Sequence, residues 1–107
     1  MDENLELTDP TPIVKLPTES LSVSFDFSIK MHTCEELLAC TALSVVEGST
    51  ALTLAAINDV TIDSNKQVAW ARISSGTAEL DSLVRMTCTT NQNNTLARQV
   101  KVQVRSK

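Results

Sequence analysis

Aromatic residues and glycine are scarce in this chain of 107 residues. It contains two Phe, one Trp and no Tyr, which leaves few flat rings for a site that stacks bases or sugars. Its two glycines are Gly48 and Gly76, so the sequence cannot supply a glycine-rich loop that cradles phosphates. Both shortages argue against nucleotide chemistry.

The single histidine and the three cysteines give little material for catalysis or metal binding. Nucleophilic catalysis needs a base held against the thiol, and a structural zinc site normally needs four ligands at recognisable spacings. The order His32-x-Cys34-x5-Cys40 with a distant Cys88 fits neither requirement. We therefore expect a loop histidine and packed thiols, with no catalytic residues, no metal and no cofactor.

An odd number of cysteines also does not predict a disulfide framework. Cys88 alternates with apolar residues and is expected in the core. A bridge between Cys34 and Cys40 stays open for an oxidising setting only. The acidic pairs Glu35-Glu36 and Asp59–Asp63 lack the alternating Asp and Asn of a calcium loop, so we expect solvated loop charges.

The net charge of −4 is unevenly distributed. Residues 1–28 hold six acids and one base, whereas residues 29–107 hold seven acids and eight bases. The start reads as a flexible acidic arm over residues 1–11, which is either solvated or docks on a basic partner. An acidic chain disfavours nucleic-acid binding. The sequence shows no secretory signal and no run long enough to span a membrane, so we expect a cytoplasmic product.

Apolar residues at every second position are the main structural signal, because this spacing predicts strands with one buried face. Three segments show it clearly: residues 21–27, 83–90 and 100–104. Further candidates are residues 13–16, 39–46 and 68–73, and the weaker ones are residues 50–54 and 59–62. About seven short strands separated by turn residues predict a sandwich or a barrel.

Three stretches carry more specific expectations. Trp70 is expected to face inward. The polar residues 91–95 predict a hairpin loop, because Asn tolerates positive φ. The stretch 29–38 is ambiguous: Thr33 and Glu36 match a capping box, which leaves a single helical turn open.

Three basic residues form the candidate interaction surface. Arg85 alternates with apolar residues of one strand, and Lys101 and Arg105 alternate with the last valines, so all three share the polar face of the final hairpin. Such a stripe suits an acidic partner or a nucleic acid. The alternative is a solvent face that is charged to prevent edge-to-edge pairing.

The order of the segments resembles small immunoglobulin-like proteins encoded in tailed bacteriophages and prophages, over residues 20–105. The resemblance rests on the following segments: Phe25-Asp26-Phe27-Ser28, the Ser/Thr-rich residues 40–46, a strand with Trp70, the turn Ile73-Ser74-Ser75-Gly76-Thr77-Ala78, the Thr-alternating residues 84–90, a turn with Arg98, and a final Val-x-Val-x-Val. The chain departs from that group after the Gly-Thr turn, where Tyr is frequent, in the Asn-Asn turn, where Gly is frequent, and at Phe27, where Trp is frequent. These departures put any specific contact surface in doubt.

The resemblance implies one immunoglobulin-like sandwich of about seven antiparallel strands over residues 12–107. It also implies a non-catalytic head or tail accessory, decoration or joining protein that contacts capsid or tail subunits, first in the bacterial cytoplasm and then in the virion. No small-molecule substrate and no membrane are expected. Two alternatives remain: a stand-alone module that binds a host protein or a surface glycan, and a thiol-dependent enzyme that uses Cys34 or Cys40.

Overall fold

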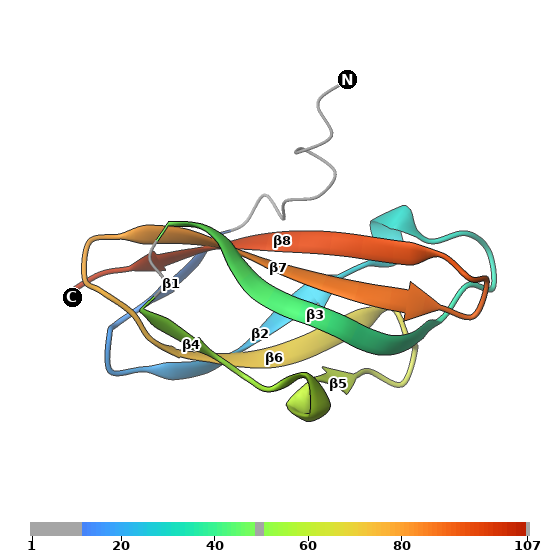
Figure 1. Ribbon diagram of the computed structural model, residues 1–107, viewed down its shortest axis with the longest axis horizontal. Helices are drawn as coiled ribbons and strands as arrows, with labels where there is room; N and C mark the ends of the chain where they lie inside the picture. Colours follow the sequence, from blue (N-terminus) through green and yellow to red (C-terminus); the bar gives the residue numbers. More distant parts are fainter. Residues whose placement is uncertain (1–11, 49–50, 107) are drawn as a thin grey trace, which may run out of the picture.

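Two β-sheets face each other in the computed structural model, which describes residues 12–48 and 51–106 (Figure 1). Sheet A has the order β1-β8-β7-β3, and sheet B has the order β2-β6-β4 with β5 also paired to β6. The strands are β1 (Ile13–Lys15), β2 (Ser20–Asp26), β3 (Leu37–Gly48), β4 (Leu52–Leu54), β5 (Thr61–Ile62), β6 (Val68–Ser75), β7 (Asp81–Thr90) and β8 (Thr95–Val104). The predicted all-β sandwich is therefore confirmed.

The strand count and one strand direction differ from the sequence-based expectation. The described residues form eight strands, and β1 runs parallel to β8, with Ile13 opposite Val102. β1 lies at the edge of sheet A, and the chain then crosses to β2 in sheet B through a turn in which Glu19 N donates to Leu16 O (3.1 Å). The strand that follows β1 in the chain lies in the other sheet, so β1 has no partner joined to it by a tight turn. No hairpin therefore requires β1 to be antiparallel to its neighbour.

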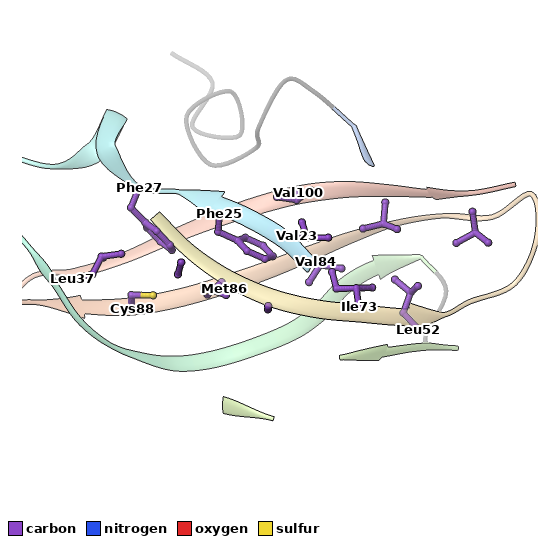
Figure 2. Close-up of a cluster of buried hydrophobic side chains, with 14 residues drawn as sticks. Val23, Phe25, Phe27, Leu37, Leu52, Ile73, Val84, Met86, Cys88 and Val100 are labelled. Carbon is purple, nitrogen blue, oxygen red and sulfur yellow. The ribbon is translucent and has the colours of Figure 1, made fainter. Parts of the chain in front are cut away.

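The core lies between the sheets and follows the predicted alternation. Val23, Phe25 and Phe27 face inward from sheet B, and Met86 and Cys88 face them from sheet A (Figure 2). Both Phe side chains have no exposed surface. Burying a side chain of this size contributes roughly 1.5–3 kcal/mol, so the few aromatic residues contribute strongly to the core.

The inward placement of Trp70 is wrong. Ala69, Ala71 and Ile73 are the buried residues of β6, and Trp70 is 41% exposed on the outer side. Phe25 lies opposite Ala69 in the register, so a small residue accommodates the ring of its neighbour across the strands. Arg72 has the same parity as Trp70 and could have indicated the outward face.

In the part of the chain that the structure describes, the helical turns are two short 3-10 segments, η1 (Ser28–Lys30) and η2 (Ile57–Asp59). η1 precedes the predicted Thr33–Glu36 turn, and the reciprocal bonds fall one residue earlier than a Thr33–Glu36 capping box: His32 N donates to Glu35 Oε1 (2.9 Å) and Glu35 N to His32 O (3.1 Å). Within residues 12–48 and 51–106, no helix has the length and apolar character needed to cross a membrane.

Candidate interaction surface

The register of the β7–β8 hairpin determines where the three predicted basic residues point. Val84 lies opposite Val100 and both are buried, so the intervening positions of the two strands point outward. Arg85 and Lys101 therefore lie on the outer face of sheet A, and Arg105 follows the end of β8 with the same parity as Lys101. The predicted hairpin loop is confirmed, with Asn93 at φ 62° in its turn.

Asp81 gathers two of the three basic side chains. Arg105 Nη1 donates to Asp81 Oδ1 at 2.9 Å, and Lys101 Nζ lies 3.6 Å from Asp81 Oδ2. The hydrogen bond from Arg105, followed by the charges of Arg105 and Lys101, lowers the pKa of Asp81. We call Asp81, Lys101 and Arg105 the Asp81 cluster.

The backbone around Arg105 is held by a second carboxylate. Ser106 donates to Glu79 Oε2 through its backbone N at 3.0 Å and through its hydroxyl at 3.1 Å. Glu79 N in turn donates to Val104 O at 2.7 Å. The segment that carries Arg105 is therefore fixed beside the start of β7.

Arg85 has a different environment from the Asp81 cluster. Its Nε and Nη2 donate to Gln99 Oε1 at 3.0 Å and 2.7 Å, across the β7–β8 register. Gln99 is only 3% exposed. The structure thus brings Lys101 and Arg105 together and holds Arg85 further along the same face.

Acidic side chains on the outer face of sheet A offset the positive charge of its basic side chains. A shallow pocket of about 270 Å³ is lined by Glu47, Asp81, Ser82, Leu83 and Lys101. Glu47 comes from the end of β3, and Leu83 lies opposite both Glu47 and Lys101 in the register. The surface therefore alternates positive and negative side chains, which suits a partner with a matching pattern better than a uniformly acidic one.

Asp81 is the residue of this surface that the sequence-based prediction missed. It has the same strand parity as Arg85, and Lys101 is two residues from the position opposite Asp81. A parity count along the hairpin could have found it. The count would have replaced a basic stripe with a mixed-charge cluster.

The cysteines and the histidine lie apart from this surface. Cys34 is exposed in a turn, and Cys40 lies opposite Cys88 in the β3–β7 register. Burial, together with the nearby Cys40, raises the pKa of Cys88 to about 12. Among the described residues, no group of three or more His, Cys, Asp or Glu side chains is placed to hold a metal ion. The predicted arm, residues 1–11, lies outside the described residues.

One comparison with known proteins gives a match. A family model described as podophage GP4 fiber-tail adaptor protein gp77 matches residues 15–103. That span includes the six strands β2 to β7 complete and all of β8 except Val104. Of β1 it includes Lys15 alone. No curated protein and no solved structure matches the chain.

Proposed function

The chain belongs to the family of podophage GP4 fiber-tail adaptor protein gp77, and on this premise we propose that it joins a fibre subunit to the tail of a phage virion. The family is a structural component of the phage particle. The match over residues 15–103 carries the proposal. An adaptor needs two docking surfaces, and a two-layered sandwich offers two opposite outer faces.

The outer face of sheet A is the first proposed docking surface, with Arg85, Lys101 and Arg105 as its basic contacts. The side chains of the Asp81 cluster are between 32% and 46% exposed. Half-exposed ion pairs of this kind stabilise a fold by about 1 kcal/mol or less. The cluster can therefore exchange internal pairs for pairs with a partner at small cost to folding.

The remaining parts of the proposal concern chemistry and location. The chain acts without catalysis and without a cofactor, and it does not bind nucleic acid, in line with its net charge of −4. It assembles in the host cytoplasm. Residues 1–11 are acidic in composition, and their deletion tests whether they take part in assembly.

The experiment compares the purified chain with a Lys101→Gln, Arg105→Gln double variant in binding to the purified fibre and tail subunits of the same virus. We expect the variant to bind one subunit at least about tenfold more weakly at low salt, since close charge pairs across an interface contribute this much. Lys30→Gln in η1 is the matched control. Unchanged binding of both subunits to the double variant would remove this face from the proposal.

A further inference from the structure

The edge of sheet B opposite β2 is interrupted at Arg72. β4 pairs with residues 73–75 of β6, and β5 pairs with Ala69 and Trp70. Ala55, which follows β4, still donates from its N to Arg72 O at 3.0 Å. The chain then leaves the sheet, passes through η2 and returns as β5. Figure 1 shows β4, η2 and β5 following one another along β6. The edge strand is thus split into two short pieces, with the break opposite Ala71, between Arg72 and Trp70.

A pocket of about 370 Å³ lies beside this break, and we call it the Arg72 pocket. Its lining residues are Thr53, Leu54, Ala55, Asp59, Arg72 and Ser74. The volume falls in the range of sites that hold a small ligand or a partner's side chain. One guanidinium, one carboxylate and two hydroxyls line the same pocket, so it offers both donors and an acceptor.

Arg72 is positioned before any partner binds. Its Nη1 donates to the backbone O of Ser20 at 3.2 Å and to the Ser20 hydroxyl at 3.3 Å. These bonds come from β2, on the side of β6 away from η2. A guanidinium that is already oriented loses less side-chain freedom on binding, which favours affinity.

Trp70 stands beside the pocket on the same outer face. Its register neighbours are Ser24 on β2 and Thr61 on β5, which are both shorter. The chain has one Trp, and it is 41% exposed instead of contributing to the core. Exposed Trp and oriented Arg are the residue types that most often dominate binding energy at protein interfaces.

We propose that Trp70 and the Arg72 pocket bind an uncharged segment of the fibre or tail subunit that sheet A does not contact. An amide group of that segment accepts from Arg72 and donates to Asp59, and an apolar side chain packs on the Trp70 ring. A carboxylate would meet Asp59 and an ammonium would meet Arg72, so charge complementarity favours the neutral group. This inference rests on the proposed adaptor function.

The test measures binding of purified fibre and tail subunits to Trp70→Ala and to Arg72→Gln. We expect both variants to bind one subunit at least about tenfold more weakly, and the other subunit unchanged. Ser22→Ala is the matched control, because Ser22 lies opposite Arg72 on the same face. Because the partner is uncharged, raising NaCl from about 50 mM to about 500 mM should change this affinity less than about threefold.

The outcomes separate the two proposals. If the wild-type chain binds both subunits and both variants bind like wild type, the inference is wrong and the adaptor function stands. Steep salt dependence of the pocket-dependent binding would also overturn it, because the partner would then be charged. If the wild-type chain binds neither subunit, the adaptor function fails and the inference with it. Should Trp70→Ala not fold, Asp59→Asn together with Arg72→Gln decides the question.

Discussion

At the end of the sandwich where β7 turns into β8, the buried carboxylate of Glu35 accepts hydrogen bonds, whereas at the opposite end the buried ammonium of Lys15 donates them. Glu35 is 2% exposed and Lys15 is 1% exposed. We call these the Glu35 end and the Lys15 end. Charged side chains are rarely buried without partners. Each of these two side chains therefore marks a point where backbone groups bond to a side chain instead of to a neighbouring strand.

The Glu35 end is a set of loops joined by hydrogen bonds, and the Glu35 carboxylate is their buried acceptor. Glu35 Oε2 accepts from the Thr90 hydroxyl at 2.6 Å and from Asn94 Nδ2 at 2.8 Å, and Oε1 accepts from His32 N. A carboxylate has room for several donors. It therefore links the segment before β3 to the β7–β8 turn. Asn91 adds to this link, because its N donates to Glu36 O at 3.0 Å and its Nδ2 donates to Cys34 O at 3.3 Å.

The Lys15 end instead joins the two sheets. Lys15 lies on β1 in sheet A, and its Nζ donates to the carbonyl of Ser75 at the end of β6 in sheet B and to Leu16 O. Both glycines with positive φ, Gly48 and Gly76, also lie at this end. The comparison indicates a tightly packed end where the sheets meet and a hydrogen-bonded end where loops meet.

The largest expected effect is that of Gly76→Ala, which tests the tight packing of the Lys15 end. An added Cβ would lie 2.8 Å from Val104 Cγ2 and 2.9 Å from Leu52 Cδ2, at a φ of +110°. Overpacking and the left-handed backbone together should lower the free energy of unfolding by about 2–4 kcal/mol. Urea unfolding measures this, and a loss near zero would contradict the close packing of this end.

The next effect is that of Thr90→Val at the Glu35 end. The variant keeps the shape of the side chain and removes the hydroxyl that donates to Glu35. A hydrogen bond to a charged group contributes about 1.5–3 kcal/mol, and we expect a loss of that size in urea unfolding. Thr41→Val is the matched control: Thr41 is exposed and donates to Thr87 O at 3.2 Å, so its loss should stay within about 0.5 kcal/mol.

Acidification tests the carboxylate itself. Hydrogen bonds from Thr90, His32 N and Asn94 lower the pKa of Glu35 from 4.5 to about 2. Because the pKa is lower in the folded state, the stabilisation is complete above pH 4.5 and is lost as the pH falls toward 2. The lowered pKa values of Glu79 and Asp81 act in the same direction. We therefore expect the stability difference between wild type and Glu35→Gln to shrink over this range, and a constant difference would contradict the assignment.

The sequence predicted the sandwich because the core rests on local parity. Each of the three alternating segments has one apolar face that must be buried, and this holds independently of the other segments. These segments are residues 21–27, 83–90 and 100–104. The inward prediction for Trp70 rested on the size of the residue, whereas strand parity places Trp70 on the same outward face as the charged Arg72. The expectation of a solvated charge was wrong at Glu35, because its side-chain donors Thr90 and Asn94 lie 55 and 59 residues away in the sequence. Arg72 became visible as a site residue only in the fold, whereas the parity of the β7–β8 hairpin could have indicated Asp81.

Lys15→Met tests the other buried charge and should have a smaller effect. Two carbonyls lose their donor, but a buried charge is replaced by an apolar side chain of similar length, so we expect a loss of about 1 kcal/mol at pH 7. Burial lowers the pKa of Lys15, and Glu19 opposes this in part. The folded protein therefore releases this proton more readily, and wild type should gain stability relative to Lys15→Met as the pH rises toward 10.5. A gain on lowering the pH instead would show that the ammonium is not desolvated.

The smallest expected effect is that of Asn93→Gly, the counterpart of Gly76→Ala at the Glu35 end. Asn93 has φ 62° and is exposed in the β7–β8 turn. Glycine would relieve the left-handed strain but would also gain freedom in the unfolded chain, so the two terms should nearly cancel and leave a change within about 0.5 kcal/mol. Asn93→Val retains the strain in a β-branched residue and should cost about 1–2 kcal/mol. If Asn93→Gly destabilised as much as Gly76→Ala, the two ends would be packed alike, and the contrast between them would rest on the buried charges alone.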